Sequence, residues 1–190
     1  MAKIETTCVQ GGWEPKKGEP RVVPIYQSTT FKYDTSAQMA DLFDLKAEGY
    51  FYTRLQNPTN DVVAKKIAAL EGGVAAMLTS SGQAASFYSI FNICEAGDHF
   101  ISTAAIYGGT FNLFEVTMRK LGIEVTFVSR TPKEGQISYQ EITSQIMAEY
   151  KLIVNCTPLG MYPVDACPNI PYECLTYEHL LYDLINNTEK

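Results

Sequence analysis

The hydrophobic residues of this chain follow two patterns that alternate along the sequence. Some segments have the spacing of an amphipathic helix, and others are short apolar runs typical of a buried strand. Strands that alternate with helices are typical of a mostly parallel sheet covered on both faces. The sequence therefore predicts an α/β fold. The pattern indicates helices over residues 37–47, 60–70, 83–94, 110–121 and 139–150, and strands over residues 74–79, 100–103, 123–128, 152–155 and 180–185.

Residues with special backbone preferences mark where some of these elements begin and end. Asn60 has the side chain of an N-cap for the helix that runs to Leu70, and Gly72 and Gly73 should stop that helix. The run 74–79 is apolar almost throughout, so we expect a buried strand there. Residues 49–60 are expected to form a polar and aromatic loop.

Composition narrows the class of protein. The chain has 190 residues, of which 46% are hydrophobic and 19% are charged, and this is ordinary for one large or two small globular domains. A net charge of -6 makes nucleic-acid binding an unlikely role, because no basic stripe is present to neutralise phosphates. No apolar run is long enough to span a membrane, and no secretory leader is recognisable, so we expect a cytoplasmic protein without membrane contact.

The cysteines and histidines give little reason to expect a metal. Five cysteines without a CxxC spacing and only two histidines do not make a recognisable zinc site. We therefore expect no metal, and we expect the cysteines to be reduced and mostly small core residues.

Three short segments carry candidate chemistry. Ser80, Ser81, Gly82 and Gln83 follow the predicted strand 74–79 and open a helix, so their backbone N–H groups and the helix dipole favour an anion. Read alone, such a turn is more often a simple N-cap than a ligand site.

The second segment is Tyr52-Thr53-Arg54, in which a guanidinium and a phenol are suited to a phosphate, although a solvated loop is the simpler interpretation. In the third segment Tyr107 precedes two glycines, which suits stacking on a flat ring, whereas packing is the commoner role of a single tyrosine.

Taken together, these segments resemble one family. YTRLQNPT, TSSGQAA and AIYGGTF, with the opening GGWEPKKGEPRVVPIYQSTTF, resemble the Cys/Met-metabolism family of pyridoxal-phosphate enzymes, and within it the O-acetylhomoserine sulfhydrylases, over residues 6–128. The resemblance implies pyridoxal phosphate as cofactor, a small amino-acid substrate and a homo-oligomer. It implies that Gly82 and Gln83 hold the cofactor phosphate through backbone amides, that Tyr107 stacks on the pyridine ring, and that Tyr52 and Arg54 reach the phosphate in the neighbouring subunit.

The same resemblance shows what the chain lacks. The family places its cofactor-linked lysine in an SxTK-like motif and an acid beside the pyridine nitrogen in a DNT-like motif, and neither motif occurs here. Lys120, Lys133 and Lys151 match no such position. No catalytic residue is therefore assigned.

The later residues resemble a different family. VSRTPKEGQISYQEI, KLIVNCTPLGMYPVDACPNIPYECLT and HLLYDL resemble the NADP-binding domain of shikimate dehydrogenases, which reduce 3-dehydroshikimate with NADPH, over residues 125–186. The resemblance implies two groups of NADP contacts, a site for the 2′-phosphate and a loop beside the nicotinamide. For the 2′-phosphate site, an ordinary surface turn is the alternative interpretation. The first comprises Ser129, Arg130 and Thr131, and the second comprises Asn155, Thr157 and Met161.

This second site is also incomplete, because the glycine-rich turn for the pyrophosphate and the shikimate-binding domain have no counterpart here. We therefore predict a chimera, with residues 1–128 forming a partial pyridoxal-phosphate transferase domain and residues 129–190 a partial Rossmann-like NADP-binding unit. The two segments overlap at LGIEVTFVSR, residues 121–130. Whether they share one sheet is left open by the sequence.

Three functions remain open at this stage. The chain is a truncated sulfur-amino-acid enzyme related to homocysteine and methionine synthesis, a shikimate dehydrogenase fragment that binds NADP weakly, or a non-enzymatic remnant. Both families bury their sheets under helices for which this sequence has no counterpart. We therefore expect exposed apolar surface, a marginal fold and no turnover by the chain alone.

Overall fold

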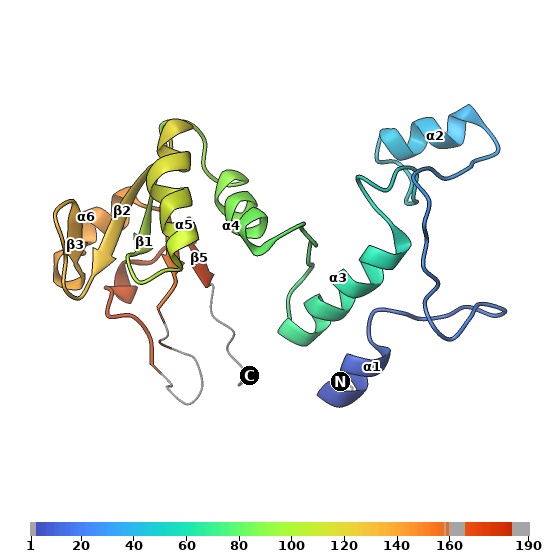
Figure 1. The fold of residues 1–190 in the computed structure, drawn as a ribbon, viewed down its shortest axis with the longest axis horizontal. Coiled ribbons are helices and arrows are strands. Elements are labelled where there is room, and N and C mark those ends of the chain that lie inside the picture. Colours follow the sequence, from blue (N-terminus) through green and yellow to red (C-terminus); the bar gives the residue numbers. More distant parts are fainter. Residues whose placement is uncertain (1–2, 158, 160–165, 184–190) are drawn as a thin grey trace. The chain divides into compact units, whose positions relative to one another are not determined.

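The computed structural model describes residues 3–157, 159 and 166–183, and it divides into two compact units (Figure 1). The first unit ends at Thr79 and the second begins at Ser80. The boundary between residues 128 and 129 that the two resemblances predict falls inside a strand of the second unit. It is therefore not the boundary between compact units.

The first unit contains three helices, α1 (Ile4–Gln10), α2 (Ser36–Phe43) and α3 (Pro58–Glu71). Helix α1 packs against α3, and Lys66 Nζ donates a hydrogen bond of 3.0 Å to the Cys8 carbonyl. Gly12 has a φ of 83°, and a Cβ there would lie 2.1 Å from the Val62 carbonyl oxygen. Only glycine permits this close approach of the chain to α3.

Helix α3 starts three residues earlier than the sequence pattern predicts. Asn57 is its N-cap, with Oδ1 accepting a hydrogen bond of 2.9 Å from the Thr59 N–H, and Pro58 occupies the first helical position. Asn60 lies within the first turn, so its prediction as the cap is wrong. The helix ends as predicted, because Gly72 takes the left-handed conformation, with a φ of 65°.

Residues 74–79 do not form the buried strand that their apolar sequence predicts. Val74 is fully exposed, Met77 is 72% exposed, and the order of the sheet includes no strand from this segment. A strand needs a neighbour for its N–H and C=O groups, and a hydrophobic run does not supply one. That prediction is wrong for this structure.

The second unit is built on a single parallel sheet, which confirms the predicted α/β class. Its strand order is β3-β2-β1-β4-β5, and every neighbouring pair is parallel. The segments on both sides of the predicted 128/129 boundary therefore share one sheet. The strands are β1 (His99–Thr103), β2 (Glu124–Ser129), β3 (Gln136–Ser138), β4 (Leu152–Asn155) and β5 (Leu180–Asp183).

The connections between strands are shorter and less regular than predicted. The helix expected over 110–121 is a short α-helix that continues as a π-helix, and the one expected over 139–150 is a 3₁₀ turn followed by α6. Helix α1 and strand β3 have no clear signal in the pattern. The elements are α4 (Gly82–Phe91), α5 (Gly108–Asn112), the π-helix η1 (Leu113–Met118), the 3₁₀ turns η2 (Tyr139–Glu141) and η3 (Tyr172–Cys174), and α6 (Ser144–Glu149).

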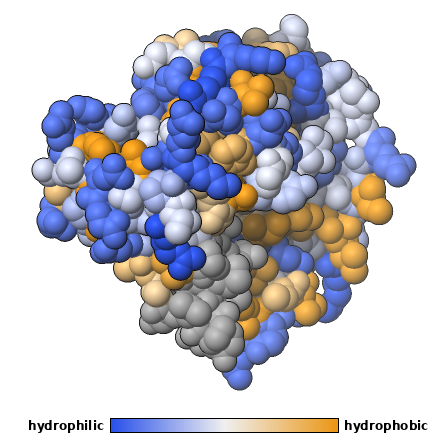
Figure 2. Space-filling model, turned by 60° about the vertical axis from the view of Figure 1, so that its left-hand side comes forward, coloured by the Kyte–Doolittle hydropathy of each residue, from blue (hydrophilic) through white to orange (hydrophobic). Residues whose placement is uncertain are grey.

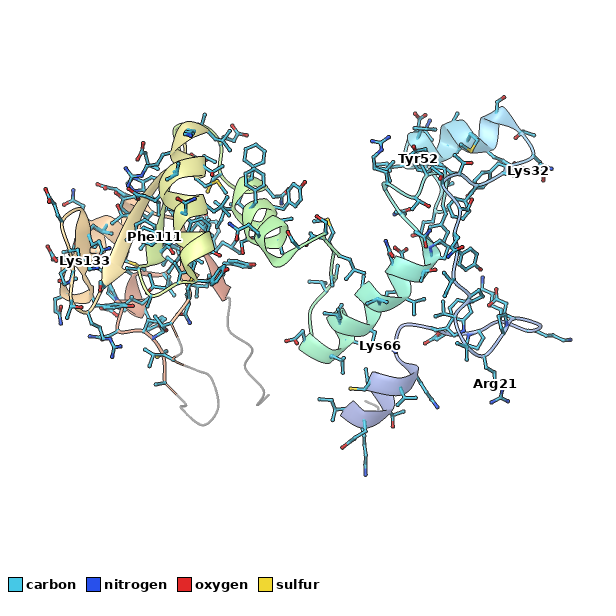
Figure 3. All side chains as sticks on the ribbon, viewed as in Figure 1. Arg21, Lys32, Tyr52, Lys66, Phe111 and Lys133 are labelled. Atoms are coloured by element: carbon cyan, nitrogen blue, oxygen red, sulfur yellow. The ribbon has the colours of Figure 1, made fainter. Side chains whose placement is uncertain are left out.

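Both faces of the sheet are covered by side chains from these helices. On one face, Phe100 meets Phe114 of η1 edge to face, with ring centroids 5.0 Å apart, and Phe111 stacks on Phe127 at 4.2 Å (Figure 3). On the other face, Ile101 packs with Met147 of α6. Adjacent residues of β1 thus face opposite cores, as strand geometry requires.

Hydrophobic residues also reach the surface between hydrophilic ones, as expected from the sequence (Figure 2). On α4, Tyr88 and Phe91 are each about half exposed, although Phe91 stacks on Phe87 with centroids 5.0 Å apart. No helix in the described part of the chain is long and apolar enough to span a bilayer.

The start of β1 carries a pH-sensitive group. His99 Nε2 lies 2.9 Å from Thr126 Oγ1, and the imidazole meets the Tyr150 ring edge to face. Burial lowers the pKa of His99 below its usual value. The folded protein therefore binds fewer protons at this residue than the unfolded chain does.

We predict that the free energy of unfolding falls as the pH drops below about 6.5, the pKa of an unfolded histidine, until the folded imidazole also protonates. Urea unfolding of the wild type and His99→Gln, compared between about pH 8 and about pH 5, measures this contribution. The variant should show a smaller loss of stability on acidification. Equal losses would contradict the prediction.

Candidate functional site

The turn before α4 forms both a helix cap and an open N-terminus. Ser81 is the N-cap, and its Oγ accepts a hydrogen bond of 3.1 Å from the Ala84 N–H. Gly82 and Gln83 occupy the first two helical positions, whose N–H groups find no acceptor within a helix. No heavy atom would lie within 4 Å of a Cβ at Gly82, so the approach to these amides is open.

The loop after β1 brings an aromatic ring to the same place. Tyr107 is the N-cap residue of α5 and is 79% exposed. The Gln83 side-chain amide donates a hydrogen bond of 3.0 Å to the Gly109 carbonyl, which joins the turn before α4 to the loop after β1. A Cβ at Gly109 would lie 2.7 Å from Tyr107 Cε1. Gln83, Gly109 and Tyr107 are therefore neighbours, as the candidate site requires.

The contribution of the Gln83 side chain was not predicted, because the resemblance assigns only its backbone amide a role. Its acceptor, Gly109, lies 26 residues further along the chain. No local spacing in the sequence signals a bond of this kind. The chemical capacity of the cluster is clear, since helix N–H groups favour an anion and an exposed phenol ring favours a flat partner.

The Tyr52 and Arg54 pair lies in the first unit (Figure 3). The Arg54 guanidinium carbon is 5.0 Å from the Tyr52 ring centroid, and the Arg54 side chain is exposed. Thr53, between them, fixes the loop through a hydrogen bond of 2.9 Å from its N–H to the Thr29 carbonyl and a second bond from its hydroxyl to the Ser28 carbonyl. The pair thus presents a cation from an anchored loop.

The residues predicted to hold NADP lie at the carboxyl ends of two strands. Ser129 ends β2, and its Oγ accepts a hydrogen bond of 3.2 Å from the Thr131 N–H, while Arg130 is exposed. Asn155 ends β4, and its Oδ1 accepts bonds from the Thr157 N–H at 3.0 Å and the Thr157 hydroxyl at 2.8 Å. Met161 lies outside the described residues.

Two further titratable groups, the Cys94 thiol and the Tyr50 phenol, are poor candidates for chemistry. Burial raises the pKa of the Cys94 thiol to about 11, with a smaller contribution from Asp98, so this thiol stays protonated near neutral pH. Burial and the hydrogen bond to Asp61 raise the pKa of Tyr50 to about 12. Among the described residues, no cluster of three or more metal-binding side chains is found.

A family model described as "Cys/Met metabolism PLP-dependent enzyme" matches residues 5–156. The chain belongs to this family. The O-acetyl-L-homoserine sulfhydrylase of Leptospira meyeri is 47% identical over 134 residues, which are 70% of this chain and 30% of the relative. The homocysteine/cysteine synthase of Saccharomyces cerevisiae is 42% identical over 130 residues, 68% of this chain and 29% of the relative. The chain thus spans about 30% of the length of these relatives.

Solved structures agree with the family. A putative O-acetylhomoserine (thiol)-lyase from Campylobacter jejuni, which carries N′-pyridoxyl-lysine-5′-monophosphate, superposes with a TM-score of 0.71 at 29% identity. The superposition covers 87% of this chain and 40% of that one. The fold is that of the pyridoxal-phosphate-dependent transferases, and pyridoxal phosphate is the cofactor of the family.

The family match extends past the predicted boundary at residue 128. It includes Arg130 and Asn155, which the second resemblance assigns to an NADP site, and ends at Cys156. The comparisons give no support to a shikimate dehydrogenase segment. The fusion, its boundary and the NADP contacts therefore stay predictions.

The geometry around Gly109 gives a prediction with a matched control. In Gly109→Ala the Tyr107 ring has to turn away from the new methyl group, and its exposure permits this with a change in stability of about 0.5 kcal/mol or less. The Tyr107 ring signals in an NMR spectrum should shift. Gly108→Ala has no heavy atom within 4 Å of its new carbon and should leave those signals in place. Equal shifts in both variants would contradict this arrangement.

Proposed function

We propose that this chain is the part of a sulfur-amino-acid enzyme that holds the phosphate and the ring of pyridoxal phosphate, and that the parental reaction acts on O-acetylhomoserine to make homocysteine. The hydrogen bond from Gln83 to the Gly109 carbonyl carries the proposal, because it joins the open N-terminus of α4 to the exposed Tyr107 ring. The names of the relatives support the choice of substrate.

The residues present fit this cofactor. The open space at Gly82 admits a phosphate to the first N–H groups of α4, and the dipole of this ten-residue helix favours its charge. Tyr107 offers an exposed face for stacking on a flat heteroaromatic ring. When bound, pyridoxal phosphate supplies an electron sink for negative charge that develops on an amino-acid substrate.

The same proposal limits what the chain does alone. Lys120 and Lys133 are exposed, and Lys151 pairs with Glu178 at 3.5 Å, so none is a buried amine next to Tyr107 and Gln83. Without a lysine in the position that the family uses, we expect reversible cofactor binding and no turnover.

Tyr52 and Arg54 have a separate role in this proposal. We infer that they contact the cofactor phosphate of a second copy of the protein, as the family resemblance implies. The exposed guanidinium of Arg54 on an anchored loop supports this role, since a planar cation can bind two phosphate oxygens at once.

Calorimetric titration with pyridoxal phosphate tests the site. Pyridoxal, which lacks the phosphate, should bind about tenfold more weakly or worse if the α4 N–H groups hold the phosphate. Tyr107→Ala should weaken binding of pyridoxal phosphate several-fold, whereas the control Tyr177→Ala, which removes another highly exposed ring, should not. Equal affinities for the two compounds would exclude a phosphate site.

A second candidate function rests on the order of the strands. Five parallel strands in the order β3-β2-β1-β4-β5 match the order of a dinucleotide-binding sheet, in which the end of the second strand lies near the adenosine ribose. In this chain the second strand ends at Ser129, and Arg130 and Thr131 follow it. We propose NADP binding, without hydride transfer, as the alternative activity of residues 129–190.

NADPH and NADH separate this alternative from a chance surface turn. If Arg130 binds the 2′-phosphate, NADPH should raise the melting temperature more than NADH does, and Arg130→Ala should remove the difference. Lys133→Ala deletes another exposed cation on the same loop and should leave the difference unchanged. Equal stabilisation by both nucleotides would rule out the alternative.

A further inference from the structure

A cavity of about 420 Å³ opens within the second unit, on the face of the sheet that α6 covers. This volume lies within the range of small-molecule sites, about 300–1,000 Å³. Most of its wall is aliphatic. The wall includes Ile101, Val128, Ile142, Met147, Ile153 and Leu181.

The sheet separates this cavity from the cofactor-binding segments. Ile101 and Val128 belong to the core on the cavity side, whereas their neighbours Phe100 and Phe127 belong to the core beneath α4, α5 and η1. The cavity therefore lies mainly on the face opposite the Tyr107 cluster, although Val154 and Tyr182 of the other core also contribute to its wall. Occupation of one does not require occupation of the other.

Three polar side chains of the cavity wall lie at the carboxyl ends of β1 and β4. Thr103 ends β1, and Asn155 and Thr157 end and follow β4. The connection after β1 covers one face of the sheet, and the connection before β4 covers the other, so the two strands meet at a topological switch point. Ligands of open parallel sheets bind in this crevice.

Thr103 gives this end of the cavity a hydrogen-bond donor. The residue is buried, with a relative exposure of 6%, and its Oγ1 accepts a hydrogen bond of 3.2 Å from the Ala105 N–H. A hydroxyl can donate as well as accept, and no bond donated by this one is found in the described part of the chain. A ligand with a carbonyl or ether oxygen would use that hydrogen.

The absence of charge defines the ligand further. Among the described residues that line the cavity, none is an acid, a lysine, an arginine or a histidine. A charged ligand would lose its hydration without gaining a counter-ion, and this cost excludes phosphates and carboxylates. We propose that this cavity binds a small neutral molecule with an apolar body and one hydrogen-bond acceptor at the Thr103 end.

Three probes of nearly equal size test the proposal by calorimetry and protein-observed NMR. Acetophenone is neutral and has one acceptor, benzoate is its charged counterpart, and α-methylstyrene lacks the acceptor. Acetophenone should bind about tenfold more tightly than benzoate. α-Methylstyrene should bind more weakly than acetophenone, because it leaves the Thr103 hydroxyl without its acceptor. Equal binding of acetophenone and benzoate would overturn the proposal.

Two variants locate the binding site. Ile153→Phe fills the cavity and should abolish acetophenone binding, whereas Ile137→Phe makes the same change on the same face but outside the cavity wall and should not. Circular dichroism establishes that both variants are folded. If Ile153→Phe retains the wild-type affinity for acetophenone, the proposal is wrong.

Thr103→Val keeps the shape of the side chain and removes its hydroxyl, so it also tests the site if Ile153→Phe does not fold. This variant should bind acetophenone and α-methylstyrene with equal affinity. A preference for acetophenone that survives in Thr103→Val would show that the acceptor is held elsewhere, and the proposed orientation would be overturned.

Discussion

The second unit depends on the burial of β1 between two layers of side chains. Phe100 and Ile101 are adjacent in sequence but belong to different cores, and both are at most 5% exposed. Such a strand is stable only when helices cover both faces of the sheet. The same strand ends at Thr103, which lines the cavity, and leads through a short loop to Tyr107. The packing of β1 therefore positions both candidate binding sites.

The sequence correctly predicts those helices and strands whose own residues carry a recognisable pattern. Apolar residues locate β2 and β4, and the pair Phe100-Ile101 locates β1. Gly72 marks the end of α3 because a left-handed residue is needed there. The prediction from sequence is wrong where contacts with distant parts of the chain determine the local structure. Residues 74–79 are more apolar than β1 but pair with no strand of the sheet. Asn57 outcompetes Asn60 as the cap because Pro58 pre-forms the first turn. For the site, the motifs identify Tyr107 and Gly82, whereas the Gln83 to Gly109 bond has no local signal.

The single sheet is continuous across the boundary that the two resemblances predict. Parallel strands pair through backbone groups, and β2 pairs with β1 and β3 in one continuous register across residues 128 and 129. On this strand Val125, Phe127 and Val128 are apolar and buried. The register and the burial of β2 are thus consistent across residues 128 and 129, as one continuous strand requires.

The two candidate sites have opposite chemical character, and the difference follows from the groups that line each of them. On the α4 and α5 face, helix N-termini leave N–H groups directed outward beside an exposed tyrosine, so a charged and flat molecule finds partners without burial of its charge. On the α6 face, none of the described residues that line the cavity is charged, and their polar side chains are hydroxyls, one amide and one thiol. Because both sets of groups come from the second unit alone, binding at either face needs no residue of the first unit. Arg54, in contrast, belongs to the first unit, and in its proposed role it would serve the phosphate site of a second copy.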